Sequence, residues 1–552
     1  MNGEKNERKT DKDIKKFLRA KTGVFYGRIA FLTILSLLTA GLSLAFSYSA
    51  KFIVNSVGDE KRVVFCVVLS LVLLLSRIIL GAFLNYFSGK TRAKIVQKLR
   101  ADLFESFVNA DALSSGKYHS GEIINRFTSD VNEVAGDVVY IVPTAASVAF
   151  RLIGTLALLF VVDVYFALIF LGGSLVTTGL VALYRKKIKE YRKETLVADG
   201  KTRSFVQESV AANVTIKAYG AEEKMSAKEK SLDENYYRAV MKRNVLASLM
   251  NGVYSLIGNA GLIFAIVYFA VGGILSSTAD YGSALSVILL LIGVQQPINT
   301  LSAVISALYT LSVSASRLKE IDDLNKKSAD KHVICDFDEI LMESVSFSYG
   351  DGDVIKNACF HIKKGEKVCV AGDSGQGKST FFKLLAGVYK PDCGSVTVSG
   401  GGKTNSVTET TGLFAYVPQG NFLFSGSVYD NIVCFADEKP TDEQIKTALA
   451  VADANFVYSL KDGVDTLLTE RGGGLSEGQI QRLSIARAYL SQRSVLLFDE
   501  ATSALDEKTE ETVLKNIIAL KEKTCIFISH RPKVLSLADR VEKLENGEFI
   551  DL

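Results

Sequence analysis

The first 314 residues alternate long apolar runs with polar and charged stretches. Each run is about 20 residues or longer, which is enough for a helix to cross the hydrocarbon core of a bilayer. A helix is expected there because it satisfies its own backbone hydrogen bonds where lipid offers none. The runs predict membrane-spanning helices over residues 25–53, 62–87, 138–160, 162–184, 246–273 and 283–310.

The loops between these runs indicate the orientation of the chain. Residues 88–136 and 185–245 are long and rich in Lys and Arg, whereas the short loops at Asp163 and at 276–280 contain neither. The basic pair at 61–62 is an exception. The positive-inside rule places both termini and the C-terminal domain in the cytoplasm. We therefore expect a multi-pass protein of the cell inner (plasma) membrane.

The long basic loops keep an apolar spacing typical of helices. Ile95, Leu99, Leu103 and Phe107 recur at helical intervals. A helix over 61–109 would be roughly 70 Å long at 1.5 Å per residue. It would extend well past the membrane, although a solvated charged helix is an alternative interpretation.

The pattern changes near residue 315. A charged stretch is followed by short apolar strands, glycine turns and helices, and residues 494–498 and 524–529 are typical of buried strands in a mostly parallel sheet. The basic N-terminus does not resemble a cleavable signal, and it is too short for a peptidase domain that would cleave a leader peptide. The expected domains are a cytoplasmic N-terminus (1–24), a six-helix transmembrane domain (25–314), a linker (315–338) and a nucleotide-binding domain (339–552).

Composition agrees with a chain that lies partly in lipid. Apolar residues make up 48% of the 552 residues, and the net charge of +4 gives no argument for a nucleic-acid partner. The seven cysteines form no C-x-x-C pair, and the four histidines are scattered. Free thiols in a reducing cytosol are the expected state.

A phosphate-binding loop is predicted at residues 372–379. The sequence Gly-Asp-Ser-Gly-Gln-Gly-Lys-Ser fits G-x-x-x-x-G-K-[ST], and it lies between a strand-like and a helix-like segment. The glycines would let backbone N–H groups converge on phosphate oxygens at a helix N-terminus. Lys378 would contact the terminal phosphates of ATP, and Ser379 would bind Mg²⁺. A glycine turn with a chance lysine is the alternative, and the strand–loop–helix context argues against it.

An apolar strand ends in two acids at Asp499 and Glu500. Such a strand would deliver Asp499 to the magnesium ion, directly or through water. Glu500 would then polarise the attacking water as a general base. A strand that ends in acids means little alone, but this one follows the phosphate-binding loop by about 120 residues.

Residues 475–479, Leu-Ser-Glu-Gly-Gln, continue into Gln-Arg-Leu-Ser-Ile-Ala-Arg-Ala at 481–488. This segment resembles the signature of ATP-binding cassette (ABC) proteins. The usual family form has Gly in place of Glu477, and the variant leaves Ser476 and Gly478 in place. The resemblance implies that this segment caps the γ-phosphate of ATP held by the opposite subunit, so that one ATP site needs two cassettes.

Other family motifs occur in the expected order. Tyr349 resembles the aromatic residue that stacks on adenine, with an edge-strand tyrosine as the alternative. Gln419 resembles the Q-loop glutamine, 503–506 the D-loop, His530 the switch histidine and 469–472 the X-loop of exporters.

The resemblance implies three groups of site residues in this chain. The catalytic group is Glu500, His530, Lys378 and Gln419. The nucleotide-binding group is Tyr349, Gly372, Asp373, Ser374, Gly375, Gln376, Gly377, Lys378, Ser379, Thr380, Gln419, Ser476, Gly478 and Gln479. The magnesium ligands are Ser379, Gln419 and Asp499.

The resemblance covers the whole chain and implies an ABC exporter half-transporter. Its fold would be a membrane α-helical domain with six transmembrane helices, followed by an α/β P-loop domain with a helical subdomain. Residues 121–130 resemble the first intracellular loop, 112–119 the first coupling helix and 215–223 the second, with Tyr219 as the plug into the other cassette.

The expected partners follow from this resemblance. Because Lys378, Gln419, Glu500 and His530 are all present, a homodimer with two competent sites is favoured, and a heterodimer is the alternative. The remaining partners would be the lipid bilayer and an exported substrate that the sequence does not identify: a peptide, a lipid or an amphipathic small molecule. An ABC-type regulator or gated channel that uses the same ATP cycle without export is the second function class.

Charges inside the expected spans form a separate hypothesis. Arg77 and Arg151 fall within apolar runs, and Lys51 lies near the outer end of the first run. A membrane-embedded arginine usually faces a partner or a water-filled path. A cationic patch for an anionic or amphipathic substrate is one interpretation, and an ion pair or a snorkelling head group is the other.

Overall fold

The structure is a computed structural model that describes residues 2–118, 120–276, 281–324, 332–334, 336–350, 352–420, 422–469 and 472–551. It divides into two compact units. The helical unit comprises Met1–Glu105 and Ser120–Asp322, and the α/β unit comprises Ser106–His119 and Asp323–Leu552.

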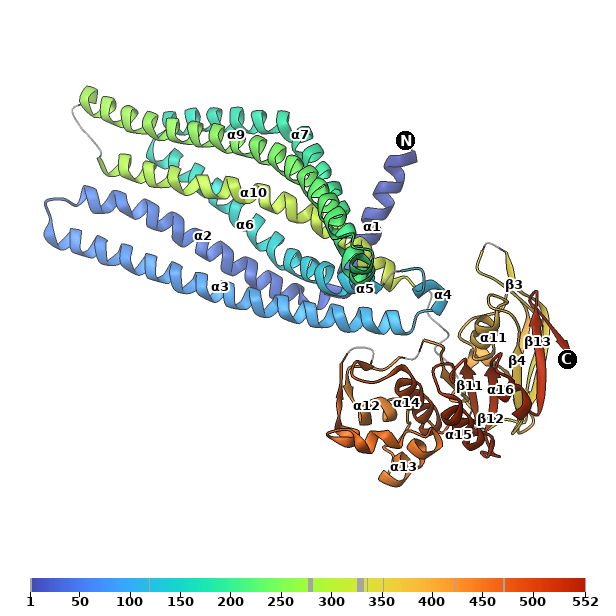
Figure 1. The fold of residues 1–552 in the computed structure, drawn as a ribbon. Coiled ribbons are helices and arrows are strands. Elements are labelled where there is room, and N and C mark those ends of the chain that lie inside the picture. The colour runs from blue at the N-terminus through green and yellow to red at the C-terminus, as the bar shows by residue number, and fades with distance from the viewer. Residues whose placement is uncertain are drawn as a thin grey trace. The chain divides into compact units, whose positions relative to one another are not determined.

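The helical unit is built from long helices that run beside one another (Figure 1). The short elements are a 3₁₀ turn at Gly23–Phe25 and a π-helical turn, η2, at Arg126–Asp130. The α-helices are α1 Asn2–Thr22, α2 Tyr26–Asn55, α3 Glu60–Val108, α5 Ser120–Asn125, α6 Val131–Val162, α7 Val164–Ala211, α8 Asn213–Ala218, α9 Glu222–Ser276 and α10 Tyr281–Asp322.

The six expected spans lie in α2, α3, α6, α7, α9 and α10, which confirms the predicted fold class for the described part of the chain. Four helical stretches in that part are long and apolar enough to cross a bilayer: Lys12–Asn55, Glu60–Val108, Ser120–Val162 and Glu222–Val271. The spans expected over 162–184 and 283–310 fall in part on residues whose side chains lie outside the description. The long helix expected over 61–109 is α3, with 49 residues.

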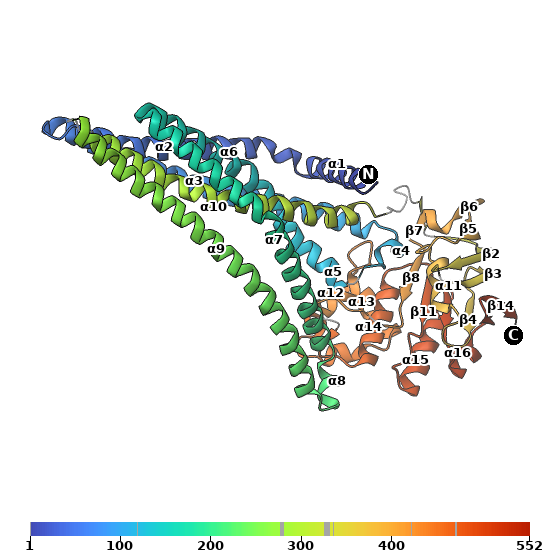
Figure 2. The same cartoon turned by 90° about the horizontal axis from the view of Figure 1, so that it is seen from above.

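Two groups of helices pack within the helical unit. The helices α2, α6 and α10 contact one another, and α7 packs along α9. Figure 2 shows α7 and α9 leaving the other helices together and meeting at α8. A buried hydrogen bond of 2.9 Å from Ser36 Oγ to the Pro143 carbonyl joins α2 to α6. The expected second coupling helix therefore lies at the tip of a helical hairpin.

That tip ends in a specific turn. The helix α8 stops at Ala218, and the Ala221 N–H then bonds to the Ile216 carbonyl at 3.0 Å. Gly220 adopts a φ of +59°. This is a Schellman motif, which favours glycine because other residues are strained in the left-handed region. The turn leaves Tyr219 with 83% of its surface exposed, and it shortens the helix expected over 215–223.

The α/β unit contains a six-stranded sheet with the order β14-β13-β4-β12-β11-β8. The strands from β13 to β8 are parallel, and β14 is antiparallel to β13. The bounds are β4 Lys367–Ala371, β8 Phe414–Val417, β11 Val495–Asp499, β12 Thr524–Ile528, β13 Arg540–Glu545 and β14 Glu548–Asp551. The buried strands expected over 494–498 and 524–529 are β11 and β12.

A second, antiparallel sheet has the order β3-β2-β5-β6. Its strands are β2 Glu339–Ser348, β3 Asp353–Lys363, β5 Cys393–Gly400 and β6 Lys403–Ser406. Two short pairs complete the strands, β1 His332–Val333 with β7 Thr410–Thr411 and β9 Gly426–Ser427 with β10 Leu467–Leu468. The helices are α4 Ala112–Ser115, α11 Lys378–Leu385, α12 Val428–Val433, α13 Asp442–Val451, α14 Glu477–Leu490, α15 Glu507–Ile518 and α16 Pro532–Leu537.

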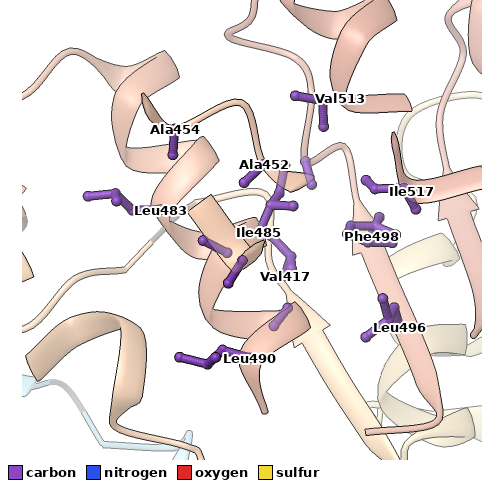
Figure 3. Close-up of a cluster of buried hydrophobic side chains, with 14 of the residues drawn as sticks. Val417, Ala452, Ala454, Leu483, Ile485, Leu490, Leu496, Phe498, Val513 and Ile517 are labelled. Atoms are coloured by element: carbon purple, nitrogen blue, oxygen red, sulfur yellow. The ribbon is translucent and has the colours of Figure 1, made fainter. Parts of the chain in front are cut away.

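The six-stranded sheet is buried on both faces because its strand side chains alternate between two apolar clusters. In β11, Leu496 and Phe498 belong to one cluster, and Val495 and Leu497 belong to the other. Figure 3 shows the first cluster, where the strand side chains face residues of α14 and α15. The second cluster includes α11 and the antiparallel sheet. Continuous apolar strands are the pattern that burial on two faces requires.

The expected first coupling helix belongs to the α/β unit. Asp111 caps the N-terminus of α4, and Ala112 and Leu113 pack against the cluster that contains α11. The helix covers only Ala112–Ser115 and not the expected 112–119, of which His119 lies outside the described residues. Two serines followed by Gly116 are poor helix formers, which accounts for the early end.

Candidate active site

The loop between β4 and α11 is shaped by its glycines. Gly372, Gly375 and Gly377 adopt φ values of +149°, +87° and +92°. A Cβ on Gly372 would lie 2.4 Å from the Leu544 carbonyl oxygen, so the loop admits no side chain there. The loop delivers the chain to the N-terminus of α11, where unpaired backbone N–H groups form an anion site. The predicted phosphate-binding loop therefore has the required strand–loop–helix context.

Lys378 folds over this loop. Its Nζ donates to the carbonyl oxygens of Gly372 and Asp373 at 2.7 and 2.8 Å. The ammonium group is thus held above the loop by weak neutral acceptors. Phosphate oxygens carry a full negative charge and form stronger charge-assisted hydrogen bonds, so they would replace these carbonyls. To contact the terminal phosphates of ATP, as expected, the Lys378 ammonium needs only to exchange these carbonyl acceptors for phosphate oxygens.

Asp499 ends β11 beside the start of α11. It is 3% exposed, its Oδ2 accepts a hydrogen bond of 2.9 Å from the Tyr416 hydroxyl, and its carboxylate also bonds to the Ser379 side chain. Burial raises the pKa of Asp499, and the hydrogen bonds from Ser379 and Tyr416 oppose that shift. A buried carboxylate next to a serine hydroxyl offers the hard oxygen ligands that Mg²⁺ takes. The residues present fit the ion.

Glu500 lies at the centre of a second group. Its Oε2 accepts a hydrogen bond of 2.7 Å from Gln419 Nε2, and its Oε1 lies 3.9 Å from His530 Nδ1. Glu500 adopts a left-handed φ of +49° directly after the strand, which costs a non-glycine residue about 1 kcal/mol. The strain turns its carboxylate away from the sheet and toward Gln419. Backbone strain of this kind is concentrated at functional sites.

The sheet explains why these residues meet. Gln419, Glu500 and His530 each follow the carboxyl end of a parallel strand, and those strands are the neighbours β8, β11 and β12. Lys378 follows the next strand, β4. Ligands in open α/β sheets bind outside the carboxyl ends of the strands. The four expected catalytic residues are therefore brought to one edge.

Tyr349 follows β2 and is half exposed. Its hydroxyl lies 3.0 Å from Thr380 Oγ1, and its ring is edge-on to Phe347 and Tyr389. Burial raises the pKa of Tyr389 to about 12, with a further contribution from Tyr349. The hydrogen bond to Thr380 ties the expected adenine platform to the first turn of α11, directly after the phosphate-binding loop.

The signature residues form a helix cap. The Ser476 hydroxyl accepts a hydrogen bond from the Gln479 N–H at 3.3 Å, and Gln479 Oε1 accepts one from the Ser476 N–H at 2.9 Å. This reciprocal capping box starts α14. The side chain of Gln479, expected to bind nucleotide, is engaged in that box. Among the described residues, no hydrogen bond or ion pair joins Ser476, Gly478 or Gln479 to the phosphate-binding loop of the same chain.

The helix α14 is bonded to the D-loop at 503–506. Gln481 Nε2 donates to Ser503 Oγ at 3.1 Å, and Gln481 Oε1 accepts from the Ala504 N–H at 3.0 Å. From the other side, Arg531 donates to the Ser503 carbonyl at 2.7 Å and to Glu510 at 2.7 Å. The D-loop is thus fixed between the signature helix and the residue that follows His530.

The sequence assigned no role to Tyr416, Tyr389 or Gln481. Tyr416 could have been noticed, because it precedes Gln419 by three residues at the end of β8. The role of Gln481 depends on a contact with a loop 22 residues away and has no local signal. In the expected X-loop, Glu470 and Arg471 lie outside the described residues. Thr469, which precedes them, forms an isolated antiparallel bridge with Gly473.

The fold and this edge of the sheet define a P-loop ATP-binding cassette attached to a helical membrane domain. Comparison with protein families agrees. Residues 29–298 match the family described as the ABC transporter transmembrane region, and residues 355–503 match the family described as ABC transporter. The chain belongs to the ABC transporter family, and it has the arrangement of an exporter half-transporter, with one membrane region and one cassette.

Two curated relatives illustrate the likeness. ABC transporter B family member 1 of Dictyostelium discoideum is 29% identical over 481 residues, covering 85% of this chain and 52% of the relative. The chain therefore spans about half the length of that protein. An ATP-dependent lipid A-core flippase of Aliivibrio fischeri is 27% identical over 482 residues, covering 85% of this chain and 82% of the relative.

A solved structure of a bacterial Atm1-family ABC exporter with ATP bound has the same fold. It matches with a TM-score of 0.81 at 22% sequence identity, over 96% of this chain and 95% of that one. The family implies a multi-pass membrane protein with ATPase activity coupled to transport.

Proposed function

We propose that this chain is one half of an ATP-driven exporter that moves a substrate out of the cytoplasm. The observation that carries the proposal is the convergence of Lys378, Gln419, Glu500 and His530 at one edge of the sheet, in a chain that also contains membrane-spanning helices. The signature residues lie on a different element, so the site in one chain is half of an ATP site.

The second half would come from another cassette. All the residues expected to act on ATP are present in this chain, which favours a homodimer with two equivalent sites. A heterodimer with a related chain would satisfy the same geometry. In either case the protein would lie in the inner (plasma) membrane with its cassettes in the cytoplasm.

The chemistry follows from the groups around Glu500. Magnesium held by Ser379, Gln419 and Asp499 would neutralise charge on the phosphate oxygens. Glu500 accepts a proton from the attacking water, and the Gln419 amide fixes the orientation of its carboxylate. Lys378 and His530 stabilise the charge that develops on the transferred phosphoryl group.

Closure of two cassettes would be passed to the helices through the coupling segments. The segment that contains α4 packs on the α/β unit, and the tip at α8 exposes Tyr219. The cycle is a population shift between inward-open and outward-open states, in which ATP favours one and hydrolysis restores the other.

Transport in reconstituted vesicles tests the proposal. Vesicles that contain the purified protein and a panel of fluorescent lipids, peptides and amphipathic dyes should accumulate or flip at least one probe. The activity should require Mg-ATP and should disappear in Glu500→Gln. An ATP-dependent ion leak without movement of any probe against its gradient would instead indicate a gated channel, the alternative function.

Two arginines in the helical unit bear on the substrate. Arg151 lies in α6, and its Nε is buried without a hydrogen-bond partner among the described residues. Arg77 of α3 is a second arginine within an expected membrane span. A membrane-embedded arginine usually faces a partner or a water-filled path, and an anionic substrate would provide a partner for the arginines of these two expected spans. The name of the lipid A-core flippase relatives supports a lipid as one candidate substrate.

Replacing Arg151 with Ala should reduce substrate-stimulated ATPase activity about tenfold and leave basal activity within about twofold, because only the anion contact is lost. The measurement is the rate at which the protein releases phosphate from ATP when it is reconstituted in anionic and in zwitterionic lipid. Arg203→Ala, which removes an exposed arginine of α7, is the matched control. Equal loss of basal and stimulated activity in Arg151→Ala would contradict the anion hypothesis.

A further inference from the structure

The chain passes between its two units at only three places. These are residues 105–106, 119–120 and 322–323. The first lies within the last turn of α3, and the other two adjoin the start of α5 and the end of α10. A displacement of the α/β unit that travels along the chain must therefore enter the helical unit through the ends of these three helices.

Arg126 bridges two of those ends. It is 4% exposed, and its Nη2 contacts Glu122 Oε1 at 2.7 Å and Glu320 Oε2 at 2.8 Å. Its Nη1 donates to the Arg317 carbonyl oxygen at 2.8 Å. The planar fork of an arginine can hold several acceptors at once in a fixed geometry. One side chain thus joins α5 to the last two turns of α10.

Asp130 repeats this connection at the other end of the π-helical turn. It is 2% exposed, and its Oδ1 accepts a hydrogen bond of 3.1 Å from Ser314 Oγ and lies 3.7 Å from an Arg317 Nη1. Ser314 Oγ also lies 2.7 Å from Glu133 Oε2. Both ends of the turn Arg126–Asp130 therefore bind α10. Single π-helical turns occur frequently at functional positions.

The helix α3 binds the backbone of the same turn and of the first residues of α6. Arg100 Nε donates to the Phe127 carbonyl oxygen at 3.2 Å, and Arg92 Nη2 donates to the Asn132 carbonyl oxygen at 3.4 Å. Close by, Lys21 Nζ contacts Asp322 Oδ1 at 2.7 Å and Asp102 Oδ2 at 3.8 Å. The three helix ends are thus connected by charged groups.

The parts of α6 and α10 beside these contacts are tightly packed. Val131, Val134, Ala135, Ala315, Leu318 and Ile321 have no exposed surface. A buried charge that loses its partner in such surroundings is strongly unfavourable, so the pairs resist separation. The helix ends are therefore more costly to move apart than to move together.

We propose that Arg126 is a positioning residue that makes the ends of α3, α5–η2 and α10 move as one body. A displacement of residues 106–119 is then transmitted to α10 with its full amplitude. The outer ends of the helices respond in turn to closure of the cassettes. This inference rests on the proposed export cycle. It assigns Arg126 and Asp130 to the coupling of ATP binding to helix movement and not to ATP chemistry.

The test measures cassette closure and helix movement separately. The starting variant of the test, called the parent, carries Glu500→Gln and Val57→Cys, and its seven native cysteines are replaced. Val57 is 78% exposed in the turn between α2 and α3. Figure 1 shows this turn at the end of the helical unit opposite to α5, the helix that Arg126 directly follows. ATP retained after rapid desalting reports closure, and the distance between spin labels on the two copies reports movement.

The variants are Arg126→Met and Glu320→Gln, with Arg238→Met as control. Arg238 forms an exposed pair with Glu234 in α9 and should leave both readouts unchanged. We expect Arg126→Met to retain an amount of ATP within twofold of the parent. Its ATP-dependent change in label distances should be less than half of the change in the parent. Glu320→Gln, which removes the negative charge of one half-exposed acceptor, should show a smaller shift in the same direction.

The outcomes separate this inference from the proposed function. A full change in label distances in Arg126→Met would overturn the inference, and so would loss of ATP retention, because Arg126 would then act on the cassette. If Arg126→Met does not fold, an unchanged response in Glu320→Gln overturns it. Failure of the parent itself to retain ATP would instead contradict the proposed function.

Discussion

Glu500→Gln is expected to lower the rate of ATP hydrolysis by about 10²–10⁴-fold, the usual contribution of a general base. The amide has nearly the same shape as the carboxylate but does not accept the water proton. Its contacts with Gln419 and His530, at 2.7 and 3.9 Å in the native side chain, place it where the attacking water would bind. The variant should therefore bind ATP, close and remain closed. Phosphate release and ATP retained after desalting are the two measurements.

A second glutamate provides the control for this variant. Glu507 lies seven residues further along the chain, and its side chain is 83% exposed in a surface pair with Lys533. Exposed pairs of this kind contribute little to stability. Glu507→Gln should hydrolyse ATP at the native rate. Normal turnover in Glu500→Gln would show that another group takes the proton and would refute the assignment.

Much of the fold could be predicted because its signals are local. The apolar runs before residue 315 needed only length and composition, and the spacing of Ile95, Leu99 and Leu103 predicted the extension of α3 beyond the membrane. The strands β11 and β12 were visible as continuous apolar runs. The phosphate-binding loop was visible because its glycines are required by the backbone angles that the loop adopts.

Other features depend on contacts between distant parts of the chain. The sheet order β4-β12-β11-β8 does not follow the chain, so the sequence did not show that Tyr416 would bind Asp499, 83 residues away. The bond from Arg126 to the Arg317 carbonyl spans 191 residues. Periodicity reports which face of a helix is buried, and it does not report which helix covers that face.

The coupling segments and the signature could be predicted in part from the local sequence. Ser114, Ser115 and Gly116 were visible as poor helix formers, and Gly220 as a helix stop, yet the resemblance to a family favoured longer helices there. The pair Ser476 and Gln479 fits the capping-box pattern. Family likeness assigned Gln479 to the nucleotide, whereas the local pattern alone predicts the cap that the structure contains.

Mixed dimers should show whether each ATP site is shared between two chains. Lys378→Ala removes the phosphate-binding ammonium, and Ser476→Phe removes the helix cap and places a bulky ring where a second cassette must close. Each homodimer should lose about 10²-fold or more of its ATPase activity, because every site lacks one component that stabilises the transition state. A dimer of one Lys378→Ala chain and one Ser476→Phe chain keeps one intact site. If the sites act independently, it should recover about half of the native rate.

The same two substitutions placed in one chain give the opposite expectation. A dimer of the double variant with a native chain has a damaged component in both shared sites and should be as inactive as the single-variant homodimers. If each chain instead used its own signature, this dimer would keep one intact site, and the first mixture would have none. Chains with different affinity tags, co-expressed and purified through both tags, allow the two dimers to be compared at equal composition. Higher activity in the dimer that contains the native chain would contradict the shared site, because folding defects and lost caps are the same in both preparations.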